Sequence, residues 1–407
     1  MITESILLIL LFALMFTGGY VIKRSLFSPW SITLLVWIVV LTLYVTVDHG
    51  LQPISSQMIY GLLLWVVPFC ITSYTVSALT PQYNAPRWEP CEKNVDILTF
   101  ISMILVPYAT IKAFRNAIQM ASPEGLFYTI REQTTNPDMY DIGLIKYFVF
   151  VVYCLFIIEA NRSKIRKTRF FFTFSLCFLF FLMTMSKLTF FMVAVSSLYL
   201  LYKNKKISLK PIILFFSGFL LFAVLVQAIR GAASAEQGST ADTMLWFLAV
   251  YIVSPMQAFC TNIAESSIEW GQYTFRTFYN ILHSLGYNVY VAPVIDPFVW
   301  VPLPTNVYTV MTTYFRDFGY LGIAFFSIFE GAAIGYIYKK GITGNTILEY
   351  IYTFLLVYLT LQFFDEQIFK GLSSIIYVTI IILFCHIRLN FKNQRENNED
   401  ITSRSSL

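Results

Sequence analysis

The chain has 407 residues, of which 57% are hydrophobic and 13% charged, and its formal net charge is +5. Soluble domains carry about 25% charged residues, so this composition excludes an ordinary soluble protein and predicts an all-α integral membrane protein. The positive residues lie in short segments between apolar runs, which is typical of topology signals and excludes a nucleic-acid-binding surface.

Eleven apolar stretches approach the roughly 20 residues that a membrane-spanning helix needs. They lie near residues 5–22, 30–47, 57–78, 95–114, 141–159, 170–185, 188–202, 211–228, 320–338, 347–364 and 370–387. Basic segments follow every second stretch, and the strongest is 161–169. Because positive residues favour the inner side, this alternation places the N-terminus outside and the C-terminus inside. We expect residues 1–390 to form one membrane domain and 391–407 a disordered inner tail.

The apolar stretch Met244–Ala258 is the ambiguous case. Pro255 and Gln257 interrupt it, and counting it as a span would move Lys339-Lys340 to the outer side. We therefore predict an interfacial or re-entrant helix within a large outer loop, residues 230–319. Such a loop is far longer than a connection requires, which favours a functional role.

Several basic residues fall on the predicted outer side, where the positive-inside rule disfavours them, and four of them are considered first. Arg230 ends one span and Lys187 lies in the tight turn between two others. Each is either an interfacial side chain or a ligand for phosphate. Arg131, which lies beside Glu132, and Arg276 have similar alternatives: a surface contact of little energy, or part of an anion site.

A polar segment runs into the span near 320–338. Asn306 and Thr309 suit hydrogen bonds to sugar hydroxyls, and Asp317 could take a proton from one. Alternatively, Arg316 and Asp317 simply neutralise each other.

Two further acidic positions are notable. Glu366 either pairs with Lys370 one helical turn later or acts as a base or sugar ligand. Glu330 lies in mid-span, where an ionised group is costly, so it is protonated, paired across helices or exposed to a wet cavity. The six cysteines and three histidines form no cluster, so we expect no metal site and no disulfide framework.

Residues 180–340 resemble Wzy-type oligosaccharide repeat-unit polymerases in a series of short motifs. In chain order these are Ser186-Lys187, Arg230-Gly231, Tyr251-Ile-Val-Ser254-Pro-Met-Gln-Ala-Phe259, Gly271-Gln-Tyr-Thr274-Phe275, and Asn306-x-x-Thr309 leading to Asp317-Phe-Gly319-x-x-Gly322. Many family members carry arginine where Lys187 stands, which is a departure. The resemblance rests on the order of the motifs, their spacing and their predicted side of the membrane taken together. The first 180 residues resemble the family only in hydropathy.

The resemblance implies a glycosyltransferase of the bacterial inner membrane that joins repeat units into O-antigen or a related surface polysaccharide at the periplasmic face. The donor is a glycan on undecaprenyl pyrophosphate, and the acceptor is one repeat unit on the same lipid. No cofactor or metal is expected, because basic side chains can stabilise the pyrophosphate that leaves. The expected partners are these lipid-linked glycans, membrane lipids and a regulator of polysaccharide chain length.

On this interpretation Asp317 is the first candidate for the catalytic base and Glu366 the second. The candidate substrate-binding residues are Arg230, Lys187, Arg316, Arg276, Asn306, Thr309 and Arg131. Two alternatives stay open: an O-antigen ligase, whose acceptor is the lipid A core, and a non-enzymatic repeat-unit flippase. Flippases lack a large outer loop and usually carry charges deep in both halves, whereas here Glu330 alone is clearly in mid-membrane.

Overall fold

The computed structural model describes residues 2–23, 25–83, 86–120, 125–135, 143–208, 210, 240–261, 270–293, 296–301 and 304–388. Within these ranges the chain is predominantly helical, and its strands form one short pair. Seven of the described helices are long and apolar enough to cross a membrane. The fold is therefore that of an all-α, multi-pass membrane protein.

A helix occupies each predicted span that falls on described residues. These helices are α1 (Ile2–Lys23), α2 (Pro29–Thr46), α3 (Ser56–Leu79), α4 (Glu92–Met120), α6 (Phe148–Ala160, preceded by the 3-10 turn η1, Gly143–Tyr147), α7 (Lys167–Thr184), α8 (Lys187–Lys203), α12 (Val310–Ile342), α13 (Thr346–Thr360) and α14 (Leu372–His386). The remaining described elements are α5 (Leu126–Thr135), α10 (Thr240–Thr261), α11 (Arg276–Ser284), and β1 (Val299–Trp300), which pairs antiparallel with β2 (Pro304–Thr305). The predicted span 211–228 lies outside the described residues, so the count of eleven stays a prediction.

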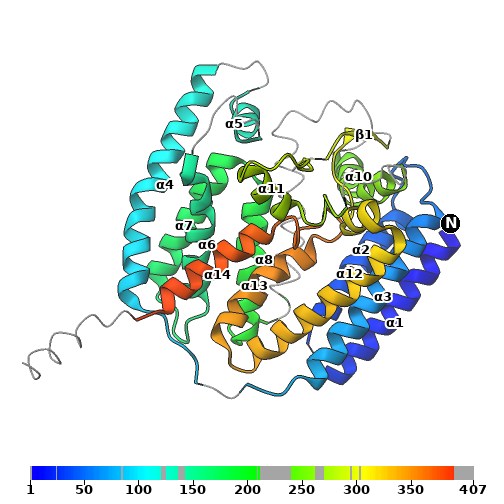
Figure 1. The fold of residues 1–407 in the computed structure, drawn as a ribbon, viewed down its shortest axis with the longest axis horizontal. Coiled ribbons are helices and arrows are strands. Elements are labelled where there is room, and N and C mark those ends of the chain that lie inside the picture. Colours follow the sequence, from blue (N-terminus) through cyan, green and yellow to red (C-terminus); the bar gives the residue numbers. More distant parts are fainter. Residues whose placement is uncertain are drawn as a thin grey trace, which may run out of the picture.

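The long helices form two packed groups that α13 joins (Figure 1). In one group α3 packs along α12, and α1 packs along α2. In the other, α4, α6, α7 and α8 pack against one another. Helix α13 contacts α12 and α2 on one side and α8 on the other, and most of its residues are buried. An apolar sequence on all faces of a helix suits this central position.

Two glycines of α12 allow α3 to approach closely. A Cβ atom at Gly331 would lie 2.7 Å from the carbonyl oxygen of Phe69, and one at Gly335 would lie 2.5 Å from that of Ser73. Membrane helices pack mainly through such van der Waals contacts, because lipid tails are as apolar as the side chains they replace. The small residues that follow Glu330 therefore bring a neighbouring helix against it.

Several of the predicted inner segments meet at one end of the bundle, which we call the basic end. Glu159, near the end of α6, accepts hydrogen bonds from Arg162 at 2.9 Å and from Arg166 at 2.5 Å. Lys203, at the end of α8, pairs with Glu349 in the first turn of α13. The predicted clustering of basic segments at a common end agrees with these contacts.

The opposite end, which we call the loop end, carries α5, α10, α11 and the strand pair (Figure 1). Helix α10 contacts the loop between α2 and α3 at two well-separated points. Trp246 donates a 3.2 Å hydrogen bond to the carbonyl oxygen of His49, and Gln257 donates one to that of Gln52. Contact with one loop from both halves of the helix is expected of a helix that lies across the end of the bundle.

Candidate functional site

Asp317 connects two sequence motifs that are distant along the chain. Its carboxylate accepts hydrogen bonds from the backbone nitrogen of Tyr273 at 3.3 Å and from that of Thr274 at 2.6 Å. Trp270 and Phe275 pack edge-on against Phe318, with ring centroids 5.2 and 6.4 Å apart. The segment before α11 is thus fixed to the start of α12 by a charged acceptor and an aromatic cluster.

The two glycines that follow Asp317 have different structural roles. Gly319 has φ 63° and ψ −154°, a conformation essentially restricted to glycine, and it divides α12 into two segments. Gly322 has no side chain where a Cβ atom would lie 2.5 Å from the carbonyl oxygen of Tyr314. Together they bend the chain so that residues 310–318 lie against the start of the longer segment.

A buried charge network lies beside this bend. Arg316 donates a 2.5 Å hydrogen bond to Asp296, and Lys370 donates to the other oxygen of Asp296 at 3.0 Å and to Asp365 at 3.1 Å. The guanidinium carbon of Arg316 lies 4.9 Å from the ring centroid of Tyr308. Arg316 therefore pairs with Asp296 in the outer loop, whereas the neighbouring Asp317 has the backbone partners described above.

Glu366 lies next to this network but does not form the side-chain pair with Lys370 that helical spacing allows. It is fully buried and accepts hydrogen bonds from the backbone nitrogens of Ile368, Phe369 and Lys370 at 2.5 to 2.8 Å. Burial raises the pKa of Glu366, against the lowering effect of these bonds, and the adjacent charge of Asp365 raises it further. The carboxyl group is therefore held rigidly and binds a proton more readily than an exposed glutamate.

A tyrosine hydroxyl connects Glu366 with the mid-span glutamate. Tyr314 donates a hydrogen bond to Glu330, and it also interacts with Glu366. Its ring stacks on Phe326 at a centroid distance of 4.5 Å and on Trp65 at 5.6 Å. Glu330 thus has a hydrogen-bond partner on the other segment of the same helix, α12, and the three alternatives for its charge stay predictions.

Three buried hydroxyl groups near the bend have no hydrogen-bond partner among the described residues. They belong to Thr274, Thr309 and Thr312. A buried hydroxyl without a partner costs about 1–3 kcal/mol, so such groups are rare unless water or a ligand satisfies them. Thr309 immediately precedes α12, so the predicted polar segment 306–313 contributes two of these donors.

Three other predicted substrate-binding residues belong to described elements of the loop end. Arg276 donates a 2.8 Å hydrogen bond to the carbonyl oxygen of Ala292, and burial lowers its pKa. Burial also lowers the pKa of Arg131, opposed by the nearby Tyr251 of α10. Asn306 is partly buried between β2 and α12.

For two predicted phosphate ligands, Lys187 and Arg230, the structure describes no side-chain contacts. Lys187 begins α8 two residues after Met185, whose φ of 46° makes the tight turn. The side chain of Lys187 and the whole of Arg230 lie outside the residues described. Both assignments stay predictions.

The sequence did not single out Asp296 and Tyr314 as members of the site. Asp296 stands in a Val-Ile-Asp-Pro run without a charged neighbour, and Tyr314 stands two residues before Arg316 as one of many aromatic residues of the chain. An acidic residue in a loop rich in proline and aromatic residues was the available signal for Asp296. The described residues contain no group of three or more side chains of the types that bind a metal ion.

Comparison with known proteins gives one similarity. The chain is 26% identical over 174 residues to a protein of Escherichia coli (strain K12) named "Putative O-antigen polymerase". The match covers 40% of this chain and 39% of that protein, so the chain spans about two fifths of that relative's length. No protein-family model matches the chain, and no solved structure matches it.

Proposed function

We propose that this chain is a membrane glycosyltransferase that polymerises undecaprenyl-pyrophosphate-linked repeat units into O-antigen or a related surface polysaccharide. The observation that carries the proposal is the similarity to the Escherichia coli protein described above. The geometry supports it, because ionisable side chains and unsatisfied hydroxyls gather at the loop end of an otherwise apolar bundle. The loop end faces the periplasm of a bacterial inner membrane, with the N-terminus on the same side and the C-terminus in the cytoplasm.

In the proposed reaction a hydroxyl group of the acceptor repeat unit attacks the anomeric carbon of the donor glycan. A new carbon–oxygen bond forms, the bond to the donor pyrophosphate breaks, and undecaprenyl pyrophosphate leaves. The hydroxyl proton passes to a carboxylate. Glu366 suits this role better than Asp317, because its pKa is raised by burial and a base is most efficient when its pKa is near the working pH.

Asp317 and Arg316 suit positioning roles. Asp317 accepts two backbone N–H groups, so its carboxylate fixes the segment before α11. Arg316 already has the counter-charge of Asp296, which lessens its attraction for a second anion. Both residues would then hold the outer loop in the conformation that binds the substrate.

The leaving pyrophosphate requires positive charge that is not already neutralised by a carboxylate. Arg230 and Lys187 are the proposed ligands, since the sequence predicts both at the outer ends of spans, at the level of the lipid headgroup. Arg276, on α11, and Arg131, on α5, also belong to the loop end and would contact the glycan or its phosphates. Sugar hydroxyls would bond with Asn306 and Thr309.

A deletion strain tests the proposed function through its lipopolysaccharide. Loss of a polymerase leaves lipid A core carrying one repeat unit, because flipping and ligation continue. Loss of a ligase or of a flippase leaves core without any repeat. A polymer ladder restored by the cloned gene, and absent with the empty vector, assigns the defect to this chain. Core without repeats would reject the polymerase in favour of the two alternatives.

A further inference from the structure

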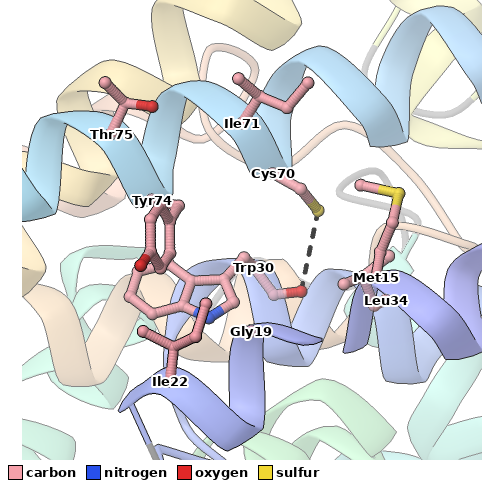
Figure 2. Close-up of a pocket in the computed structure, with 9 residues that line it drawn as sticks. All are labelled: Met15, Gly19, Ile22, Trp30, Leu34, Cys70, Ile71, Tyr74 and Thr75. Atoms are coloured by element: carbon pink, nitrogen blue, oxygen red, sulfur yellow. Dashed lines mark hydrogen bonds between the residues drawn. The ribbon is translucent and has the colours of Figure 1, made fainter. Parts of the chain in front are cut away.

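An apolar pocket lies between α1, α2 and α3, at the basic end (Figure 2). Its volume is about 250 Å³, and its lining includes Gly19, Trp30, Ile71 and Tyr74. A 3.7 Å contact from the Cys70 thiol to the carbonyl oxygen of Trp30 joins α3 to α2 at the pocket wall. An open apolar pocket of this size accommodates part of a hydrocarbon chain.

Trp30 supplies a polar group that has no partner in the part of the chain described. The residue is 2% exposed, and its indole N–H has no acceptor there. A Cβ atom at Gly19 would lie 3.3 Å from this nitrogen, so α1 packs closely against the polar edge of the ring. A buried donor without an acceptor is energetically unfavourable.

Positive charge stands at the mouth of the same pocket. The ammonium group of Lys23 lies 4.7 Å from the ring centroid of Tyr74 and 5.5 Å from that of Trp30. Lys339, near the end of α12, repels it electrostatically. Neither lysine has a carboxylate within 4.0 Å among the described residues. Two like charges without a counter-ion create a local site for an anion.

The pocket opens where a membrane lipid would reach it. In the most apolar window of α1, 17% of the residues are buried, and its main contact is with α2. The other faces of α1 therefore contact lipid if the helix crosses the bilayer. Lys23 and Trp30 stand at the same end of the α1–α2 hairpin, the level of the lipid headgroups.

We propose that this pocket binds an anionic phospholipid, with an acyl chain between α1 and α3 and the phosphate on Lys23 and Lys339. The tail gains little by leaving the bilayer, because protein and lipid are similarly apolar, so the headgroup sets the preference. This site lies at the opposite end of the bundle from the candidate glycosyltransferase site and does not depend on that function.

Native mass spectrometry of the full chain tests the proposal. The protein is extracted from nanodiscs with equal amounts of phosphatidylglycerol and phosphatidylcholine, and the lipids that remain bound are counted. We expect about a fivefold to thirtyfold preference for phosphatidylglycerol, the equivalent of ~1–2 kcal/mol from two basic residues. Lys23→Gln should lower this preference severalfold.

Lys93→Gln is the matched control, because Lys93 is an exposed lysine at the basic end that lines no part of the pocket. It should leave the preference unchanged. Equal retention of both lipids by the unmodified chain, or equal loss in the two variants, would overturn the proposal. Complete displacement of phosphatidylglycerol by millimolar inorganic phosphate would also overturn it, since the ligand would then be a free anion.

Quenching by lipids with brominated acyl chains locates the tail. Brominated phosphatidylglycerol should quench tryptophan fluorescence more than brominated phosphatidylcholine does, and this excess should disappear in Trp30→Phe. Trp88→Phe removes a half-exposed tryptophan elsewhere at the basic end and should keep the excess. An excess that survives in Trp30→Phe would place the bound tail outside this pocket and reject the assignment.

Discussion

The carboxylate of Asp317 accepts a 2.6 Å hydrogen bond from the backbone nitrogen of Thr274, 43 residues earlier in the chain. This bond joins the Gly271–Phe275 motif to the motif that begins α12. It predicts that Asp317 maintains the shape of the loop end. Substitution of Asp317 should therefore mainly lower stability, whereas substitution of Glu366 should mainly lower activity.

Asp317→Ala should lower thermal stability, because two backbone N–H groups lose a charged acceptor and each such bond is worth about 1.5–3 kcal/mol.

Glu366→Gln should abolish polymer with a smaller stability change, because the amide oxygen keeps one acceptor for the backbone. Thermal unfolding in detergent and lipopolysaccharide gels measure the two effects. Full polymer from Glu366→Gln at normal expression would exclude it as the base.

Glu330→Leu should reduce activity more than Glu330→Gln. Leucine removes the Glu330 acceptor of the buried Tyr314 hydroxyl and leaves Glu366 as its other carboxylate contact, whereas glutamine keeps an acceptor at position 330. Loss of a hydrogen bond of this kind costs about 0.5–1.5 kcal/mol. The ratio of polymer to single-repeat product on gels measures the effect. Tyr314→Phe removes the donor as well, so combining it with Glu330→Leu should add little. Normal polymer in both Glu330 variants would mean that the hydrogen bond between Tyr314 and Glu330 is not needed for activity.

Asp296→Asn should destabilise the protein by about 3 kcal/mol, because Arg316 loses its buried counter-charge. Burial alone would raise the pKa of Asp296, but Lys370 and Arg316 lower it below its usual value. Its contribution is therefore fully present above the unfolded pKa of about 3.9 and is lost as the pH falls through the lower folded value. Unfolding temperatures of both proteins between pH 3 and 7 should converge at the acid end.

Asp96→Asn provides the comparison for this effect. Asp96 pairs with Arg169 at 2.8 Å, but both side chains are exposed, so the loss should stay under about 1 kcal/mol. A similar destabilisation in the two variants would show that burial adds nothing to the Asp296 network.

Arg230→Ala should abolish polymer, while Arg230→Lys should retain a little. Guanidinium binds phosphate through paired hydrogen bonds that lysine cannot reproduce, and losing charge-assisted bonds of about 1.5–3 kcal/mol slows turnover tenfold or more. Gels of complemented deletion strains, with membrane amounts measured by immunoblot, provide the readout. Normal polymer length and amount in the alanine variant would remove Arg230 from the site.

Residues near Asn288 should react with an impermeant thiol reagent in intact cells. Asn288 is exposed at the loop end, and Cys91 and Cys260 are replaced first because both are only partly buried. Glu89→Cys, exposed at the basic end, should label only after lysis. The reverse pattern would place the loop end in the cytoplasm and exclude a periplasmic active site.

Hydropathy predicted the positions of the described long helices, because each is a local run of apolar residues. It placed the start of α12 near residue 320, whereas the helix begins at Val310. Arg316 and Asp317 ended the apolar run in sequence, but their partners lie in the outer loop. Such pairings depend on the bend at Gly319 and on loop contacts, which no local pattern encodes.

The bend at Gly319 also sets how much of α12 must match the bilayer. A straight helix of 33 residues would be about 50 Å long, well beyond a hydrocarbon core of about 30 Å. Residues 320–342 alone measure about 35 Å, which a moderate tilt accommodates. The glycine thus limits the length of α12 that has to lie in the hydrocarbon core, which relieves hydrophobic mismatch. The helical segment 310–318 is released from the requirement to be apolar, so it can carry Arg316 and Asp317.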